Sequence, residues 1–150
     1  MWVSAALALI ALTAGGTKAE AQDQVRAGTS RLTITIAGLR NDKGVVQYCA
    51  APRGSAFPDC EGTGVISGSV PISGQSATIT LPRLANGEWA IAVFHDRNAN
   101  GELDTFAGIP REGYGFSRNP GFRPRAPRFD EAVIELAGNA NIDIRMRYLF

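Results

Sequence analysis

Apolar and polar residues alternate along most of the chain from residue 31 onward. In residues 31–39, Leu32, Ile34 and Ile36 fall on one side and the threonines between them on the other, which is the two-residue period of a strand with one buried face. Further apolar runs of strand length, bounded by Gly, Asn or Pro, lie at 45–50, 64–72, 76–82, 88–95, 128–138 and 141–150. Because no segment after residue 30 repeats every 3.6 residues, the pattern predicts an all-β fold.

Seven short strands predict an antiparallel two-sheet β-sandwich, with a partly closed barrel as the alternative. Tight turns are expected at "NDKG", residues 41–44, and at "NG", residues 86–87, where neighbouring strands meet. The run "WAIAVF", residues 89–94, is apolar on both faces of its expected strand. We therefore place this strand in the middle of a sheet, with both faces covered.

Residues 96–127 interrupt the strand pattern with a long segment rich in Gly and Pro. A connection of this length inside a small domain is uncommon unless it is functional or disordered. Its apolar side chains are Phe106, Ile109, Tyr114, Phe116 and Phe122. Since a disordered linker would carry fewer aromatic residues, we expect one long ordered loop that packs onto the sandwich through these side chains.

The N-terminus has the features of an export signal. The apolar run at 3–14 has the length of a signal-peptide core but is too short to span a bilayer, and "AEA" at 19–21 fits a cleavage site. No Lys or Arg precedes the run, so an uncleaved N-terminal anchor is the alternative. We expect a signal peptide at 1–21, a flexible segment at 22–30 and a β-domain at 31–150, in a periplasmic or secreted protein without a membrane span after signal removal.

The two cysteines, Cys49 and Cys60, are expected to form a disulfide, because an oxidising compartment allows such a bond to persist. Closing so short a loop contributes roughly 3 kcal/mol on the chain-entropy estimate. The spacing is not C-x-x-C, and one histidine with no further cysteine does not make a zinc site.

Charge is balanced over the whole chain, with 15 Lys and Arg against 14 Asp and Glu, so nothing draws the protein to nucleic acid. Locally, one stretch carries a single glutamate among the arginines Arg111, Arg118, Arg123, Arg125 and Arg128. Guanidinium groups suit carboxylates and phosphates, and neighbouring aromatic rings suit sugar faces. The stretch is therefore a candidate site for a glycan or an acidic ligand, and otherwise a solvated surface.

The stretch "DRNANGELD", residues 96–104, has the order of ligands in a calcium-binding loop. Oxygen atoms at alternating positions converge on one ion in such loops, and a glycine permits the sharp turn. The candidate ligands are Asp96, Asn98, Asn100 and Asp104 through their side chains and Glu102 through its main-chain carbonyl. An oxygen-only set favours Ca²⁺ over zinc, and two carboxylates predict a weak site with a Kd on the order of 10⁻⁴ to 10⁻³ M.

This calcium prediction has one gap and one alternative. Position twelve of the loop, where a helix-loop-helix site has a bidentate glutamate, is Ala107, so Glu112 or a main-chain oxygen would have to complete the shell. The alternative is that the Asn and Asp side chains only stabilise a turn, without an ion.

Catalytic patterns are weak in this sequence. His95 is the single histidine, and it precedes Asp96 in a strand, where neighbouring side chains point to opposite faces. No serine-hydrolase or metalloprotease motif is present. A hydrolase that uses His95 with Glu112 or Asp104 is a minor alternative to a non-enzymatic protein.

The order "LTITIAGLRNDKG", "LANGEWAIAVFHDRNANGELD" and "GIPREGYGFS", followed by a final β-run, resembles a bacterial exported family known as domain of unknown function 2141. The resemblance covers residues 31–150. It implies a secreted or periplasmic β-sandwich similar to transthyretin-like and collagen-adhesin B-type modules, with no established activity. In related adhesin modules an acidic turn of this kind binds calcium, whereas the cysteine pair is not part of the family pattern.

Together these features predict a monomeric, exported and non-enzymatic β-sandwich with a weak calcium-binding loop. Its long loop would present a surface to an envelope protein or a glycan. Binding of a glycan or acidic ligand by the arginine-rich stretch is the alternative function.

Overall fold

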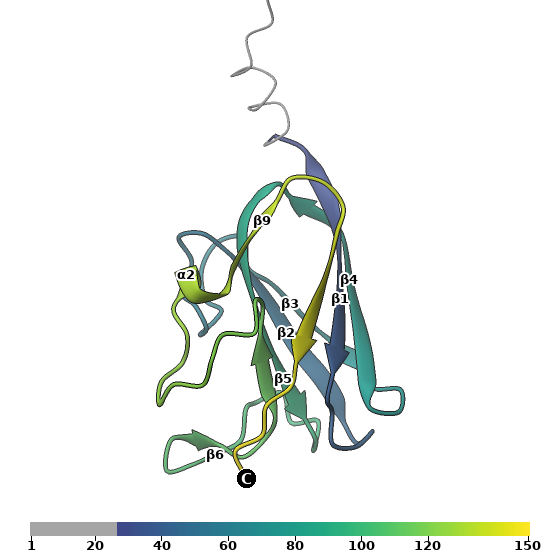
Figure 1. Ribbon diagram of the computed structural model, residues 1–150, viewed down its shortest axis with the longest axis vertical. Helices are drawn as coiled ribbons and strands as arrows, with labels where there is room; N and C mark the ends of the chain where they lie inside the picture. The colour runs from purple at the N-terminus through teal and green to yellow at the C-terminus, as the bar shows by residue number, and fades with distance from the viewer. Residues whose placement is uncertain (1–26) are drawn as a thin grey trace, which may run out of the picture.

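The computed structural model describes residues 27–150 and shows two β-sheets packed face to face (Figure 1). The expected signal peptide at 1–21 and most of the segment 22–30 lie outside the described residues. The first strand, β1, begins at Thr29, two residues before the expected start at Arg31. No helix within residues 27–150 has the length and apolar character needed to cross a membrane.

The first sheet has the strand order β10-β1-β4. Its strands are β1 (Thr29–Ala37), β4 (Ser76–Ala85) and β10 (Ala140–Arg145). The second sheet has the order β3-β2-β5-β8, and β9 also pairs with β5. Its strands are β2 (Val45–Pro52), β3 (Ile66–Pro71), β5 (Gly87–Asp96), β8 (Tyr114–Phe116) and β9 (Val133–Leu136). The predicted all-β sandwich is confirmed.

One pair of strands departs from the antiparallel prediction, because β10 runs parallel to β1. Strand β9 pairs antiparallel with the first half of β5 and runs toward the end of the domain where β1 begins. The short connection 137–139 then crosses to the first sheet, so β10 starts at the same end as β1 (Figure 1). The direction of the crossing therefore decides the pairing.

The core follows the predicted alternation. Leu32, Ile34 and Ile36 of β1 are fully buried and face Val46 and Ile91 of the second sheet in one apolar cluster. Burying each such side chain stabilises the fold by about 1.5–3 kcal/mol. As predicted, β5 lies in the middle of its sheet, between β2 on one side and β8 with β9 on the other.

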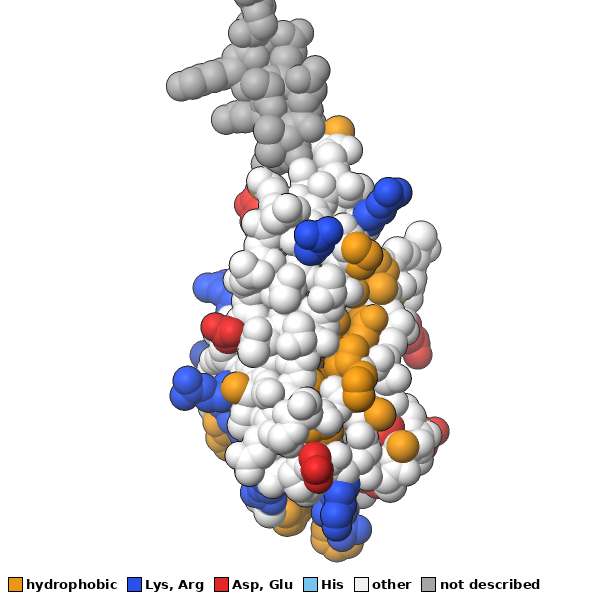
Figure 2. All heavy atoms as spheres, turned by 90° about the vertical axis from the view of Figure 1, so that its right-hand side faces the viewer, with side chains coloured by type: hydrophobic (Ala, Val, Ile, Leu, Met, Phe, Trp, Pro, Cys, Tyr) orange, Lys and Arg blue, Asp and Glu red, His pale blue; other side chains and the backbone are white. Residues whose placement is uncertain are grey.

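Apolar side chains are visible at the surface on the side where the sheets end in β3 and β4. Seen from the side of β4, a narrow strip of apolar side chains runs along the domain between polar surfaces (Figure 2). Val70 and Ile72 are half-buried against the core in this part of the chain. Half-buried apolar side chains therefore cover the core on this side.

The prediction of a loop without strands at 96–127 was wrong. The segment contains a small hairpin, β6 (Thr105–Phe106) with β7 (Ile109–Pro110), and it contains β8. Two- and three-residue strands are too short to show an alternating pattern, which is why the sequence did not reveal them.

The five apolar side chains of this segment do not all pack as expected. Tyr114 and Phe116 are half-buried on β8, but Phe106, Ile109 and Phe122 are 65%, 45% and 59% exposed. The hairpin carries two of these side chains away from the sheets, at the lower end of the domain in Figure 1.

The predicted strand at 128–138 is also shorter than expected. It begins with one helical turn, α2 (Phe129–Ala132), and only β9 is extended. The carboxylate of Glu131 accepts a hydrogen bond from the main-chain N–H of Arg128 at 2.8 Å, which caps the start of the turn.

Ser117 joins three parts of the chain where β5 changes partner from β8 to β9. Its fully buried hydroxyl accepts a hydrogen bond from the main-chain N–H of Ile91 at 2.9 Å and donates one to the carbonyl of Ala132. Ile91 lies between the residues that pair with β8 and those that pair with β9. The serine hydroxyl therefore supplies an acceptor for the N–H of Ile91, which neither β8 nor β9 provides.

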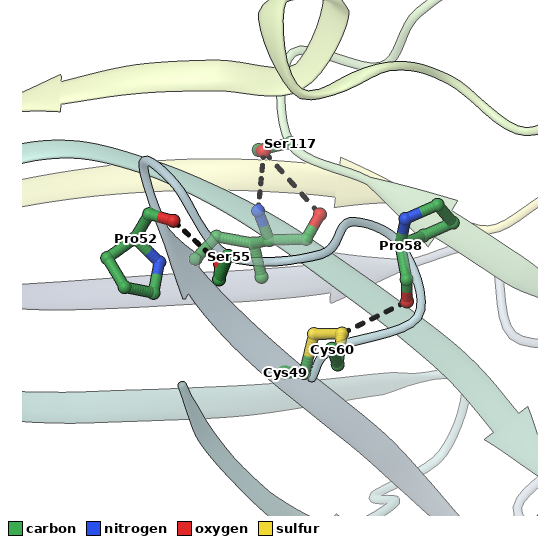
Figure 3. Close-up of a disulfide and its surroundings, with 7 residues drawn as sticks. Cys49, Pro52, Ser55, Pro58, Cys60 and Ser117 are labelled. Atoms are coloured by element: carbon green, nitrogen blue, oxygen red, sulfur yellow. Dashed lines mark hydrogen bonds between the residues drawn. A yellow bond between two sulfur atoms is a disulfide. The ribbon is translucent and has the colours of Figure 1, made fainter. Parts of the chain in front are cut away.

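The expected disulfide between Cys49 and Cys60 is present. It ties the segment between β2 and β3, residues 53–65, to β2 (Figure 3). The Cα atoms of the two cysteines are 6.2 Å apart. Cys49 is buried and Cys60 is half-buried.

The two sheets are joined beside β8, which gives the sandwich some barrel character. Tyr114 and Arg147 exchange two main-chain hydrogen bonds, of 3.0 and 2.8 Å. The side chain of Asn119 accepts a hydrogen bond from the N–H of Arg145 at 2.8 Å and donates one to the carbonyl of Asp143 at 2.9 Å. Asn119 thus occupies main-chain groups of β10 that a further strand would otherwise pair.

Candidate functional site

The acidic turn begins at Asp96, the last residue of β5, whose side chain is fully buried. Its carboxylate accepts hydrogen bonds from the main-chain N–H groups of Asn100, at 3.0 Å, and Gly101, at 2.8 Å. A third comes from the side-chain amide of Gln47 on β2, at 2.9 Å. The turn therefore folds around one buried carboxylate.

This environment changes the acidity of Asp96. Burial alone would raise the pKa of its carboxyl group, but the hydrogen bonds from Gln47, Gly101 and Asn100 outweigh burial and hold the pKa below its ordinary value. Asp96 is therefore ionised at neutral pH.

Asp104 closes the other end of the turn. Its two carboxylate oxygens accept hydrogen bonds from the side-chain amides of Asn98, at 2.8 Å, and Asn100, at 2.9 Å. The amide oxygen of Asn100 accepts the N–H of Glu102 at 2.9 Å. The structure thus brings the predicted ligands into one hydrogen-bonded turn, with the two asparagine N–H groups directed at Asp104.

The same oxygen atoms stabilise the turn and make up the predicted ligand set. Turning the two asparagine amides over would present their oxygens in place of their N–H groups. Across residues 27–150 no three His, Cys, Asp or Glu side chains form a group that could hold a metal. Any cation would therefore rely on Asn98, Asn100 and the main chain in addition to carboxylates.

Glu112 supports the turn from outside, a role that the sequence did not indicate. It is 5% exposed, and its two carboxylate oxygens accept the main-chain N–H groups of Arg97, at 3.0 Å, and Asp104, at 3.1 Å. Both ends of the turn are therefore held by one buried side chain from the residues just before β8. With its oxygens directed to the main chain, Glu112 fixes the shape of the turn.

The neighbouring 41–44 turn lies directly against the acidic turn. Gly44 has a φ of +74°, and a Cβ atom there would lie 2.0 Å from the main-chain oxygen of Asp96. Only glycine fits this approach.

His95 lies on the inner face of β5, opposite to Asp96, and is 2% exposed. Its Nε2 atom lies 2.7 Å from the carbonyl oxygen of Lys43, and its Nδ1 atom lies 2.8 Å from the hydroxyl of Tyr148. Since a carbonyl only accepts, Nε2 donates, and Nδ1 accepts the hydroxyl proton of Tyr148 in the neutral ring. The hydroxyl of Tyr148 also accepts the N–H of Arg40 at 3.1 Å.

The arginine-rich stretch is divided among several settings. Arg123 and Arg125 both pair with Glu131, at 3.5 and 2.7 Å, and Arg118 donates to the carbonyl of Asp130 at 3.4 Å. These groups support the segment around α2, and they do not converge on one open site.

The other two arginines of the predicted stretch are Arg128 and Arg111. Arg128 is exposed at the start of α2 and contacts Glu131 through its main-chain N–H. Hydrogen bonds from the side chain of Arg125 and the main chain of Arg128 lower the pKa of Glu131 to about 2. Arg111 lies elsewhere, beside Arg40 and Arg97, around a small hollow next to His95.

A larger groove of about 410 Å³ lies between β8 and the end of β10. Its lining includes Tyr114, Phe116, Asn119, Pro120, Arg145 and Arg147. Aromatic rings and guanidinium groups therefore meet here, and the sequence did not single out Arg145 or Arg147.

The comparisons with known proteins give one match. A family model described as an uncharacterized protein conserved in bacteria, domain of unknown function 2141, matches residues 34–145. No curated protein and no solved structure gives a significant match. The matched range contains the acidic turn, Glu112 and Ser117 and covers well over half of the sequence. The chain therefore belongs to this bacterial family of domain of unknown function 2141.

Proposed function

We propose that this chain is an exported, non-enzymatic β-sandwich module whose acidic turn binds Ca²⁺ weakly. The bound ion would fix the segment after β5 as a surface for an envelope or extracellular partner. The observation that carries the proposal is the convergence of Asp96, Asn98, Asn100 and Asp104 within one hydrogen-bonded turn.

The donor chemistry of this turn fits a hard cation. Carboxylate, amide and main-chain oxygens are the ligands that Ca²⁺ prefers, and Ca²⁺ tolerates irregular geometry. Asp96 and Asp104 supply the negative charge, and the turned amides of Asn98 and Asn100 would supply two further oxygens. With only two carboxylates, we expect a Kd on the order of 10⁻⁴ to 10⁻³ M.

The surroundings of His95 support a non-enzymatic role. Both ring nitrogens are engaged, by Lys43 and Tyr148, and the ring is buried. A general base must reach a substrate proton, which this ring can do only after its present hydrogen bonds break.

The segment beside the acidic turn offers apolar side chains to a partner. Leu103, Phe106 and Ile109 are 37%, 65% and 45% exposed along the turn and the β6-β7 hairpin. A cation that stiffens the turn would lower the entropy that the hairpin loses when a partner binds.

Adding about 10 mM Ca²⁺ to chelator-treated protein should stabilise it by about 1.4 kcal/mol if the Kd is near 1 mM. For a domain of this size we expect the melting temperature to rise by about 3–5 °C, which differential scanning fluorimetry measures. Asp104→Asn should abolish most of the rise, because it removes one of the two charges. Asp59→Asn, at an exposed position away from the turn, should retain it.

Two results would contradict the calcium site. Melting curves that coincide with and without Ca²⁺ would exclude binding in the physiological range. An equal rise in the Asp104→Asn variant would place the ion elsewhere on the protein.

A second candidate function is the binding of an acidic glycan in the groove between β8 and β10. The observation that favours it is the meeting of Tyr114 and Phe116 with Arg145 and Arg147 in one groove of about 410 Å³. Aromatic rings pack on sugar faces, and guanidinium groups bind carboxylates and sulfates.

Screening on an array of acidic and neutral glycans tests this function. We expect salt-sensitive binding of acidic members and an affinity loss of about tenfold in Arg145→Gln, equivalent to about 1.4 kcal/mol. Arg83→Gln, which changes an exposed arginine on β4, is the matched control. No binding on the array, or equal losses in both variants, would argue against the groove.

A further inference from the structure

Three arginines meet around a hollow of about 40 Å³ at the end of the sandwich. Arg40 follows β1, Arg97 follows β5, and Arg111 precedes β8, so distant parts of the chain contribute one charge each. Glu112 is the acidic residue in the lining, and its oxygens accept main-chain N–H groups. No ion pair joins Arg40, Arg97 or Arg111 to an Asp or Glu side chain within residues 27–150.

Several contacts hold one wall of the hollow in place. The guanidinium of Arg40 lies over the ring of Tyr148, 4.3 Å from its centroid, and donates to the main-chain oxygen of Phe150. The hydroxyl of Tyr148 is held by His95 and by the N–H of Arg40. These contacts fix the aromatic platform beneath the guanidinium.

The other wall comes from the chain just before β8. Gly113 lies under the ring of Tyr148, and a Cβ atom there would approach the ring to 2.4 Å. Its carbonyl accepts the N–H of His95 at 2.7 Å. The main-chain N–H of Arg111 donates to the carbonyl of Asp104 at 2.8 Å, so the backbone of Arg111 is tied to the acidic turn. The arginines therefore project from a framework that is fixed before any ligand arrives.

We propose that this hollow binds the phosphate or sulfate group of a small anionic ligand. Three guanidinium charges share this lining with the single carboxylate of Glu112, so positive charge is in excess, and an oxyanion bound there would reduce the repulsion among the arginines. Guanidinium groups match the oxygens of phosphate and sulfate through paired N–H donors. A hollow of about 40 Å³ admits at most one such group, so the rest of a larger ligand would extend into solvent. This site requires neither a bound cation nor the groove between β8 and β10.

Calorimetric titration with inorganic phosphate and sulfate tests the site. Chelator-treated protein is used at constant ionic strength, so that calcium and general screening do not contribute. We expect saturable binding with a Kd on the order of 10⁻³ M, because the charges are exposed to solvent. Acetate, at the same ionic strength, should bind at least about tenfold more weakly, because it offers fewer oxygens and less charge.

The double variant Arg97→Gln, Arg111→Gln should weaken phosphate binding by about tenfold or more. Both side chains are exposed and the main-chain hydrogen bonds remain, so the fold should be retained. The control is Arg31→Gln, Arg83→Gln, which removes the same charge from exposed positions on β1 and β4 and should keep the affinity within about twofold.

Three results would overturn the proposal. Titrations without saturation would show that no site exists. Equal losses in the two double variants would mean that phosphate responds only to net charge. Acetate binding as tight as phosphate binding would assign the hollow to a different chemical class.

Discussion

Replacing Asp96 with alanine should lower the free energy of unfolding by about 4 kcal/mol, measured by urea denaturation in the presence of a chelator. The variant removes a fully buried carboxylate and the three hydrogen bonds that it accepts, from the N–H groups of Asn100 and Gly101 and from the side-chain amide of Gln47. Each hydrogen bond to a charged group contributes about 1.5–3 kcal/mol, and water that reaches the exposed residues Asn100 and Gly101 recovers part of that sum. The acidic turn should lose its order along with this stability.

Asp104→Ala is the matched comparison, because the Asp104 carboxylate accepts hydrogen bonds from side-chain amides and lies at a half-exposed position. We expect a loss of less than about 1.5 kcal/mol there, since water replaces the missing acceptor. Similar losses for both variants would show that burial of Asp96 does not increase its contribution to the free energy of unfolding.

The dependence on pH gives a second measure of Asp96. The pKa of Asp96 is lower in the folded protein than in the unfolded chain, so its ionised form favours folding. This contribution is complete above the unfolded pKa of about 3.9 and disappears as the pH falls through the lower folded value. The stability difference between wild type and Asp96→Ala should therefore shrink below about pH 4. A difference that stays constant down to pH 2 would contradict this assignment.

Removing the disulfide by the double change Cys49→Ala, Cys60→Ala should cost about 3 kcal/mol of unfolding free energy. The bond joins residues separated by 11 positions. Its loss increases the conformational entropy of the unfolded chain, which lowers the free energy of unfolding. Urea denaturation of oxidised wild type and of the double variant measures the difference.

Reduction supplies the control for this prediction. A reductant should destabilise wild type by nearly the same amount as the double variant and leave the double variant unchanged. If oxidised wild type and the double variant unfold at the same urea concentration, the disulfide does not stabilise the protein. If the double variant is far less stable than reduced wild type, the loss comes from packing at Cys49, which is 6% exposed.

In the acidic turn, the residues that we propose as cation ligands also take part in the hydrogen bonds that stabilise the turn. Asp96 and Glu112 hold the turn through main-chain N–H groups, whereas Asp104 and the two asparagines face outward. Substitution at Asp104 therefore tests cation binding with little damage to the fold. Substitution at Asp96 tests the fold itself, and the two effects can be separated.

Local patterns in the sequence were sufficient to predict the β-sandwich and the residues of the acidic turn. The alternation in β1 predicted which of its side chains face the core, and Gly87 marked the turn between β4 and β5. The family also followed from short ordered motifs. These features depend on residues that are neighbours in the chain, so a single sequence contains them.

Only the tertiary structure decided which distant groups meet. The hydroxyl of Ser117 reaches Ile91 across 26 positions, and His95 meets Tyr148 across 53. Arg40 lies beside Arg97 and Arg111 because the ends of three different elements converge. No periodic signal marks such meetings, because they depend on strand order and on the crossing that makes β10 parallel to β1. The sequence therefore determined the strands and the chemistry available, and the packing of the sheets determined where that chemistry comes together.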